Sequence, residues 1–432
     1  MNPGRGRRQR PHKPVFRTAK TSPPDAASGP VVMREQNSTL VLRLLWETRE
    51  ISRADLARRT GLSRSTISGI VSDLLETGLV REERAGSSNG GRRPVLLGFQ
   101  DDISHLIGID MGATHISVAV MNLRGVVRGW RRESHDVRDD PQGSLEITRA
   151  LIRLAMSDAN VHLSGVVGIG IGVPSPVSPA SPGELSPLFM PAWQDLNIQR
   201  ALQESFPVPI KVLNDANAGA LSELWWGAGQ DSKNIAYVKI ATGVGAGLVV
   251  NGKVYEGESG LAGEIGHTSI DPTGPRCICG LNGCLNVLVG SAELLRRATD
   301  LLQTHPTSVL ASRSFRVRDL VDAAEADDPV ANEVLRYAGE NLGLGVANLL
   351  NLINPDVVIL SGGLTRAGSK LLEPLERVVE SRSLFQSAAK SRLATGKLGS
   401  QGIAIGAATS VLEMALENPS LFPKRKSVVE RP

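Results

Sequence analysis

The segments LAGEIGH (residues 261–267) and CICGLNGC (residues 277–284) are the stretch on which the interpretation of this chain depends. The second segment contains all three cysteines of the 432 residues, Cys277, Cys279 and Cys284, and the first ends at His267. Thiolates and imidazole are the ligands that Zn²⁺ prefers, and four of them complete a tetrahedral structural site. We therefore expect His267 and the three cysteines to bind a structural zinc ion.

Two other interpretations of the cysteines stay open at this level. They could be three buried free thiols, or one disulfide with a thiol left over. The odd number of cysteines and the lack of any sign of export make the disulfide the poorer interpretation. A zinc ion held by all four residues is structural rather than catalytic, because no coordination position is left open.

The composition is that of an ordinary globular protein with two or three domains. Hydrophobic residues make up 41% and charged residues 21% of the chain, whereas aromatic residues make up only 3%, which disfavours binding to nucleic acid through base stacking. No apolar run has the length of a membrane span, and no apolar core follows the Arg-rich start as it would in a signal peptide. We expect a cytoplasmic protein without a membrane partner.

Positive charge is concentrated at the start of the chain. Residues 1–100 contain 18 Lys and Arg against nine Asp and Glu, whereas residues 101–432 contain 30 against 35. This asymmetry suggests that only the first hundred residues face a polyanion. Residues 1–33 are rich in Pro, Gly and Arg and lack apolar periodicity, so we expect a disordered basic tail. It is either a solvated leader or a non-specific contact to phosphates.

Residues 34–100 have the pattern of a winged helix-turn-helix domain. Ser52 is a predicted helix cap, residues 60–62 form a Gly-containing turn, and Ser63 is a second predicted cap. After Ser63 an apolar stripe at helical spacing predicts a third helix: Ile67, Ile70, Val71, Leu74 and Leu75. A charged strand, a Gly/Ser turn and residues 90–97 then resemble the hairpin that forms a wing.

This domain is expected to bind double-stranded DNA at an operator. The start of the third helix offers hydroxyls and one guanidinium that can contact base edges: Arg64, Ser65, Thr66 and Ser68. Arg92 and Arg93 on the predicted wing suit phosphates or a minor groove. The alternative is a helical module that binds another protein, because helix-turn-helix patterns also occur outside DNA-binding proteins.

The rest of the chain alternates buried strands with glycine-rich turns, where α/β folds bind phosphates and sugars. One strand ends in Asp110-Met111-Gly112-Ala113-Thr114, and another runs into Asn214-Asp215 before a predicted helix. Further glycine-rich turns follow at residues 242–247 and 361–363.

With these segments the chain resembles the ROK family of repressors and sugar kinases, in the version that carries an N-terminal winged helix-turn-helix, similar to repressors of the xylose or N-acetylglucosamine type. The resemblance covers roughly residues 34–415. It implies an α/β fold, with the winged domain followed by a two-lobed actin-like ATPase fold over residues 101–418. The lobes divide near residue 215, and residues 419–432 form a C-terminal tail.

The resemblance also implies a sugar pocket. The family's sugar-binding positions correspond to Asn214, Asp215, Glu264, His267 and Asn286. Carboxylates suit sugars because each can accept two hydroxyl hydrogens. The family has Glu where this chain has Asn286, and the loop at residues 186–193 also departs from the family at two places, so the ligand is expected to differ from the usual one. Without the rest of the pattern, Asn214-Asp215 alone would be read as an Asx turn.

The same resemblance implies a nucleotide site, and ATP with Mg²⁺ stays an open cofactor. The matching positions are Asp110, Gly112, Thr114, Thr242, Gly243, Gly245, Gly362 and Gly363. Asp215 stands where the family's kinases place the catalytic base. Ala113 replaces a glycine of the first phosphate loop, which adds a methyl group near the expected phosphates. The alternative is that these glycines are retained for tight turns alone.

The sequence is therefore compatible with two functions. The first is a sugar-responsive repressor of carbohydrate-use genes, a homodimer or tetramer on a palindromic operator, released by a sugar or sugar phosphate. The second is an ATP-dependent kinase for a hexose or amino sugar, in which Asp215 acts as base, with or without DNA binding. The sequence favours the repressor and leaves enzymatic activity undecided.

Overall fold

The computed structural model describes residues 29–83, 94–311, 314–384 and 392–423. Backbone contacts divide the chain into two units, one ending at Gln100 and one covering Asp101–Lys424. The predicted DNA contacts Arg92 and Arg93 lie outside the described residues. Among the described residues, no helix combines the length and the apolar character needed to cross a bilayer.

The first unit is a winged helix-turn-helix, as predicted. Its elements, in chain order, are α1 (Pro30–Thr48), β1 (Glu50–Ser52), α2 (Arg53–Thr60), α3 (Arg64–Glu76), β2 (Val80–Glu82) and β3 (Leu96–Phe99). The strands form an antiparallel sheet in the order β1-β3-β2. Both predicted caps are present, because Ser52 accepts a hydrogen bond from the Asp55 N–H and Ser63 accepts one from the Thr66 N–H.

The expected boundary of the basic tail needs a correction. Helix α1 begins at Pro30 and not at residue 34, so residues 30–33 are helical. Proline suits this first helical position because it lacks the N–H that would stay unbonded there and its φ angle is already helical.

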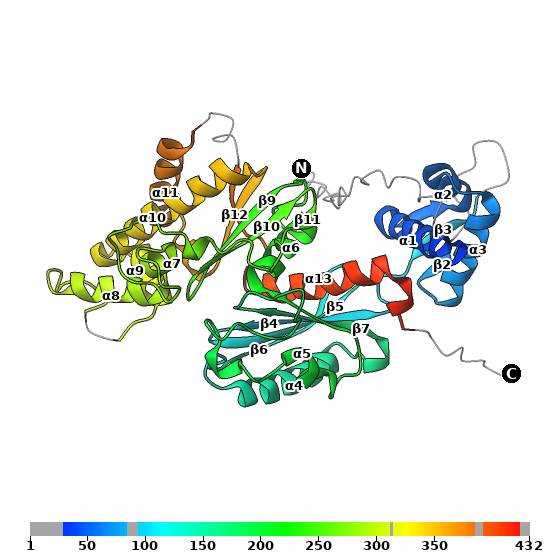
Figure 1. The fold of residues 1–432 in the computed structure, drawn as a ribbon, viewed down its shortest axis with the longest axis horizontal. Coiled ribbons are helices and arrows are strands. Elements are labelled where there is room, and N and C mark those ends of the chain that lie inside the picture. Colours follow the sequence, from blue (N-terminus) through cyan, green and yellow to red (C-terminus); the bar gives the residue numbers. More distant parts are fainter. Residues whose placement is uncertain (1–28, 84–93, 312–313, 385–391, 424–432) are drawn as a thin grey trace, which may run out of the picture. The chain divides into compact units, whose positions relative to one another are not determined.

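The second unit, called the body below, contains two five-stranded sheets (Figure 1). The first sheet has the order β6-β5-β4-β7-β8, with strands β4 (His105–Gly112), β5 (His115–Asn122), β6 (Val127–Ser134), β7 (Val166–Val173) and β8 (Ile210–Asn214). The second has the order β11-β10-β9-β12-β13, with strands β9 (Ile235–Ile240), β10 (Val244–Val250), β11 (Lys253–Val254), β12 (Val357–Ser361) and β13 (Arg392–Thr395).

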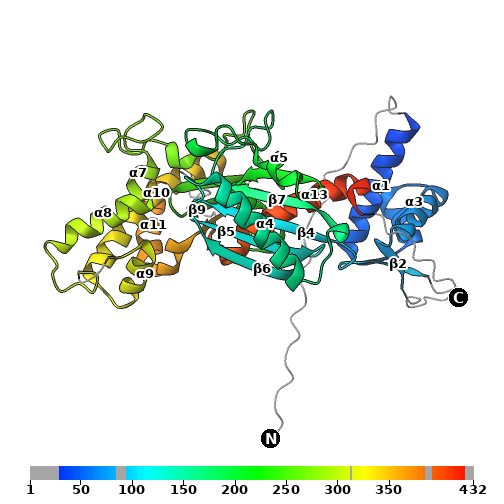
Figure 2. The same ribbon diagram turned by 90° about the horizontal axis from the view of Figure 1, so that it is seen from below.

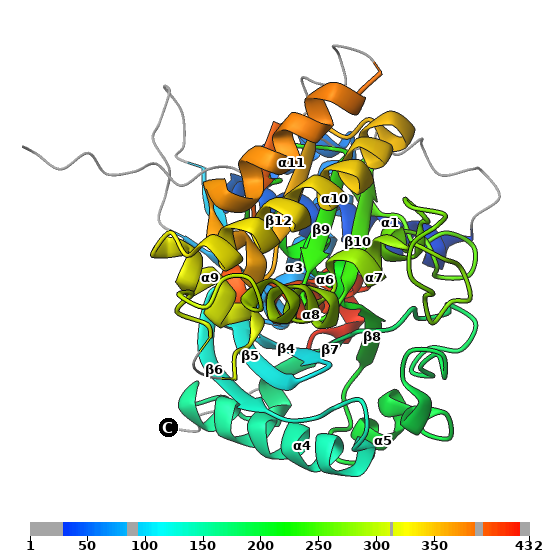
Figure 3. The ribbon, with the colours of Figure 1, turned by 90° about the vertical axis from the view of Figure 1, so that its left-hand side faces the viewer.

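Helices separate the two sheets and cover their outer faces. Helix α4 (Pro141–Asp158) lies along the outer face of the first sheet (Figure 2). Helices α6 (Asp215–Trp226) and α13 (Gly402–Glu417) pack on each other between the sheets (Figure 3). The outer side of the second sheet packs on a helical cluster made of α7 (Leu285–Val289), α8 (Ser291–Leu302), α9 (Val317–Glu325), α10 (Pro329–Ile353) and α11 (Ser369–Arg382).

Helix α13 approaches the first sheet unusually closely. A Cβ atom added at Gly170 of β7 would lie 1.8 Å from the carbonyl oxygen of Ala407. Only glycine allows backbone to pack on backbone at this distance. The layer of α6 and α13 is therefore held firmly against the strands that carry the candidate site.

The body also extends past its expected end at residue 418. Residues Pro419–Leu421 form a 3₁₀ turn, and the following Phe422 is buried. The start of the predicted C-terminal tail is therefore part of the fold, because the Phe422 ring leaves water by packing onto it.

Candidate functional site

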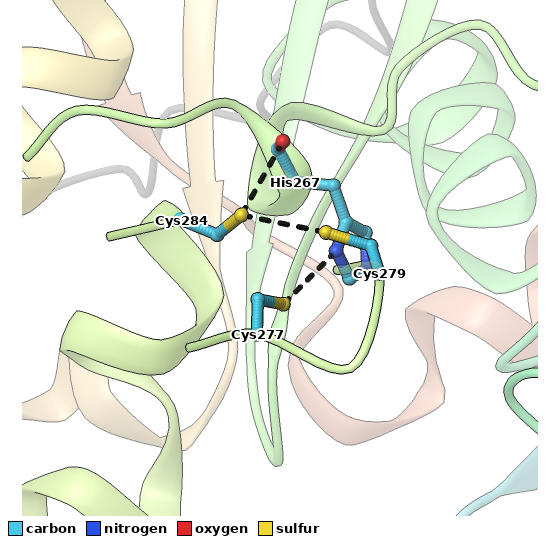
Figure 4. Close-up of side chains that lie close together, drawn as sticks. All are labelled: His267, Cys277, Cys279 and Cys284. Atoms are coloured by element: carbon cyan, nitrogen blue, oxygen red, sulfur yellow. Dashed lines mark hydrogen bonds between the residues drawn. The ribbon is translucent and has the colours of Figure 1, made fainter. Parts of the chain in front are cut away.

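Four candidate metal ligands meet just after the 3₁₀ turn η3 (Ile265–His267). The ligand atoms of His267, Cys277, Cys279 and Cys284 all lie within 4.8 Å of one another (Figure 4). His267 Nδ1 is 3.4 Å from Cys277 Sγ, and Cys279 Sγ is 3.5 Å from Cys284 Sγ. A tetrahedral zinc ion with its usual bond lengths would separate its ligand atoms by roughly 3.5–3.8 Å. The cluster thus has the composition and spacing to hold a metal ion.

The chemical state of the ligands also suits a metal. The cysteines are free thiols, and the 3.5 Å between Cys279 Sγ and Cys284 Sγ is far longer than a disulfide bond of about 2.05 Å. Burial raises the pKa of Cys284 to about 12 and lowers the pKa of His267. His267 therefore offers a neutral imidazole, and a bound metal would displace the proton of Cys284.

The backbone of the loop brings these ligands together. The Cys277 N–H donates to the Leu281 carbonyl over 2.8 Å, which closes the turn that carries Cys279. Gly283 has a φ angle of +59°, and a Cβ there would lie 1.6 Å from the carbonyl oxygen of Asp271. Glycine at this position lets the loop fold back so that Cys284 reaches the cluster.

The predicted sugar-binding residue Asn214 lies at the junction of β8 and α6. Its Oδ1 caps α6 by accepting from the N–H groups of Ala216 (2.9 Å) and Asn217 (3.2 Å), and its Nδ2 donates to the Ser175 carbonyl (3.3 Å). This amide organises the start of the helix, as an Asx turn would. It therefore fixes the position of the next residue, Asp215.

Asp215 is buried and forms an ion pair with Lys239, which projects from β9 of the second sheet. Burial raises the pKa of Asp215, and the Asp110 carboxylate adds to this effect while Lys239 opposes it. Burial alone would lower the pKa of Lys239, but the carboxylates of Asp215 and Asp110 raise it. The pair thus joins the edge of the first sheet to the middle of the second.

Asn286 of α7 contacts the second predicted phosphate loop. Its Oδ1 accepts from the Val244 N–H over 2.9 Å, and it lies so close to Gly243 that a Cβ there would approach it to 2.2 Å. The backbone of Thr242 accepts from the Ser291 N–H, and Gly245 pairs with Lys239 across the sheet. Asn286 therefore holds this loop in place.

Glu264 and His267 bracket the turn η3. Burial raises the pKa of Glu264, and the charge of Asp215 adds to the shift. The ring of Phe189 lies 5.3 Å from the His267 ring, centroid to centroid, which places the loop at residues 186–193 beside the metal cluster. In that loop Trp193 is fully buried and donates to the Val137 carbonyl over 2.7 Å, so its role is structural.

The first predicted phosphate loop joins β4 to β5. Asp110 Oδ2 lies 3.0 Å from His115 Nε2, whereas Oδ1 is buried and has no hydrogen-bond partner within the described part of the chain. The His115 ring packs so closely on Gly112 that a Cβ there would lie 2.5 Å from its Cε1 atom. The backbone carbonyls of Ala113 and Thr114 accept from the N–H groups of residues 137 and 135.

The last predicted nucleotide residues follow β12. Gly362 has a φ angle of +116°, and its carbonyl accepts from both the N–H and the hydroxyl of Thr365. Gly363 begins the 3₁₀ turn η4 (Gly363–Ala367), and the space beside its Cα is open.

The candidate DNA contacts of the first unit lie on one turn of α3. Arg64, Ser65 and Ser68 are exposed, and Thr66 is half-buried. The Ser63 hydroxyl is 2.8 Å from both the Ser65 and the Thr66 hydroxyls, so the cap also orders its neighbours. The helix start therefore presents an ordered polar surface.

Sequence reasoning did not single out three residues of the site: Lys239, His115 and Phe189. One signal for Lys239 was available, because it is the sole charged residue in the otherwise apolar strand Ile235–Ile240. A charged residue in a buried strand needs a partner. Nothing in the sequence indicated the contacts of His115 or Phe189.

Comparison with known proteins agrees with this architecture. The model of the ROK family matches residues 106–414, and a winged helix-turn-helix DNA-binding model matches residues 34–81. The xylose repressor of Bacillus spizizenii is 33% identical over 385 residues, which cover 89% of this chain and 97% of that protein.

Two solved structures are also similar. A ROK family transcriptional regulator, a homologue of the E. coli MLC protein, matches with a TM-score of 0.78 and 28% identity over 91% of this chain and 98% of its own. A ROK family glucokinase from Streptomyces griseus matches with a TM-score of 0.64 and 25% identity over 71% of this chain and 99% of its own. The chain therefore belongs to the ROK family, and it joins the domain of that family to an N-terminal winged helix-turn-helix DNA-binding domain.

Proposed function

We propose that this protein is a transcriptional repressor that binds an operator through α3 and releases it when a sugar or sugar phosphate binds in the body. The observation that carries the proposal is the combination, in one chain, of an ordered polar helix start for DNA with the buried carboxylates Asp110 and Asp215 in a ROK body. The match to a xylose repressor over nearly its whole length supports the same conclusion.

The sugar would be bound by residues from three segments of the chain. Asp215 and Glu264 supply carboxylates that accept hydroxyl hydrogens, and His267 supplies the imidazole nitrogen that is not directed at Cys277. Asn286 already bonds a backbone N–H through its amide oxygen, so its NH₂ group is what it has left to offer a hydroxyl. Asn214 uses its oxygen on the start of α6 and one N–H on the Ser175 carbonyl, which leaves its second N–H. Two carboxylates together with amide N–H donors suit a polyhydroxy ligand.

We further propose that the metal held by the cluster is zinc and that its role is structural. The donor set of three sulfurs and one nitrogen is the set that zinc prefers. The ion would pin the segment of Glu264 and His267 to the segment that begins α7. His267 would bind zinc through Nδ1 and keep Nε2 for the ligand.

The test begins with selecting operator DNA from a random pool and measuring its binding by fluorescence anisotropy. A sugar panel of xylose, glucose, N-acetylglucosamine and their phosphates is then added. We expect one sugar class to release the DNA from the wild-type protein, and Asp215→Asn to keep DNA binding while losing the release. DNA binding unaffected by every member of the panel would contradict the sugar-responsive part of the proposal.

An ATP-dependent sugar kinase is the second candidate, because a buried Asp215 stands at the start of α6 where the family's base stands. Only the repressor function requires a dimer. It would bind a palindromic operator whose half-sites lie about 34–36 Å, or a multiple of that, apart. Production of ADP from ATP, Mg²⁺ and a sugar, abolished by Asp215→Asn, would establish the kinase. Lack of ADP across the panel would leave the repressor.

A further inference from the structure

A buried group of charges lies between the two sheets of the body and is only partly explained by sugar binding. Asp110 lies near the end of β4 in the first sheet, Asp215 begins α6, and Lys239 comes from β9 of the second sheet. The side chains of Asp110 and Asp215 are 4% and 6% exposed, and that of Lys239 is 18% exposed. Lys239 pairs directly with Asp215, and Asp110 is close enough to act on the pKa values of both.

Two buried carboxylates near each other require a positive charge, because burial and mutual repulsion both disfavour their ionised forms. In enzymes that transfer phosphate, magnesium ions supply this charge and are coordinated by carboxylate oxygens and by the phosphates. Here the chain supplies an ammonium group instead. The Lys239 ammonium group donates a hydrogen bond to Asp215 Oδ2. A catalytic base would need a carboxylate oxygen to accept the proton of the attacking hydroxyl.

The neighbouring loop is closed to phosphate in an independent way. The ring of His115 covers one side of Gly112, and its Nε2 engages Asp110 Oδ2. Ala113 adds a methyl group in the same turn. Asp110 Oδ1 has no partner among the described residues, but the ion pair at Asp215 and the His115 ring over Gly112 do not fit magnesium and nucleotide phosphates at Asp215 and this turn.

We propose that Lys239 is a built-in cation that takes the place of magnesium at Asp215, so that the body binds its ligand without transferring phosphate to it. Asp215 is then an acceptor whose Oδ2 is held by Lys239, and not a proton carrier. The ion pair of Lys239 with Asp215 also connects α6 to β9. The Asp215 carboxylate that would contact the ligand is therefore positioned by elements next to both sheets. The inference deepens the proposed repressor function and rests on it only for the nature of the ligand.

The test measures divalent-cation binding with Mn²⁺ as a probe, using the zinc-loaded full-length protein and electron paramagnetic resonance of the free ion. Lys239→Gln removes the charge and keeps a side chain of similar length, and Lys239→Arg is the matched control that keeps the charge. We expect Lys239→Gln to bind Mn²⁺ at least about 10-fold more tightly than the wild type, and to be stabilised by Mg²⁺ in a thermal melt. The control should behave as the wild type does.

Tight Mn²⁺ binding by the wild type that Asp215→Asn removes would overturn the inference, as would Mg²⁺-dependent ADP production by the wild type with any sugar. Both measurements use the wild type or an isosteric variant, so the inference stays testable even if Lys239→Gln does not fold. The cation measurement involves neither sugar nor DNA. Its failure would therefore overturn the inference whatever the DNA-release assay shows.

Discussion

Replacing Cys279 by alanine is the sharpest test of the proposed zinc site. Cys279 is half-buried, and its Sγ contacts Cys284 Sγ. Loss of one sulfur atom at a half-buried position removes less than about 1 kcal/mol of hydrophobic stabilisation. Any larger effect on the body must therefore come from the lost metal ligand.

The expected loss of stability follows from the coupling between metal binding and folding, because a metal that binds only the folded body stabilises it in proportion to the logarithm of its affinity. Removing a residue that merely supports a ligand weakens metal binding about 10- to 100-fold, so removing a ligand should weaken it by at least about 100-fold. Each 100-fold loss of affinity lowers the metal-dependent stability by about 2.7 kcal/mol. For a body of this size, roughly 2 °C per kcal/mol is expected, which gives a fall in melting temperature of about 5 °C.

The assay combines zinc content by mass spectrometry with thermal melts before and after a chelator. The wild type should contain one zinc ion per chain and lose stability on chelation, and Cys279→Ala should contain less and respond little. Ile278→Ala is the matched control, because this neighbouring side chain is 53% exposed and has no ligand atom. A wild type without zinc, or a Cys279→Ala protein that keeps its zinc and its melting temperature, would refute the reasoning.

Three further substitutions test other parts of the structure. Arg64→Ala should weaken operator binding by about 1–3 kcal/mol, or roughly 5- to 150-fold, in anisotropy titrations, while Arg366→Ala on the body should leave it unchanged. Ser63→Ala removes the cap of α3 and should lower the stability of the first unit by about 1 kcal/mol in denaturant titrations. Gly170→Ala would place a Cβ 1.8 Å from a backbone carbonyl of α13 and should cost at least about 2 kcal/mol, whereas Gly165→Ala, with open space beside it, should cost little. Equal melting temperatures for these two glycine variants would contradict the close packing of α13.

Much of the fold was predictable because local rules decide it. Ser52 and Ser63 were predicted as caps from their spacing alone, since a cap satisfies N–H groups within the next three residues. The limits of the first unit and the body were less predictable. The start of α1 at Pro30 precedes any apolar periodicity, because its first described side chains are exposed. The burial of Phe422 depends on what it packs against, and sequence periodicity does not contain that information.

Part of the candidate site was also predictable. The three cysteines and His267 are close in sequence, and their residue types and clustering predicted a ligand set although their spacing is not that of a standard zinc finger. The ion pair of Lys239 with Asp215 joins residues 24 positions apart, on a strand and a helix that meet only in the folded body. Such a contact is set by tertiary packing, so the sequence could show that Lys239 needs a partner without showing which one.

The candidate metal cluster and the candidate sugar-binding residues are connected by a short structural path. Cys284 immediately precedes α7, and the second residue of that helix, Asn286, holds the Val244 N–H of the second glycine-rich loop. That loop continues directly from β9, which carries Lys239. A metal bound at Cys284 therefore fixes the start of α7, and through Asn286 it fixes the loop beside the carboxylates. A neutral amide at Asn286 adds no further carboxylate to a body in which Asp110 already raises the pKa of Asp215 and Asp215 raises the pKa of Glu264.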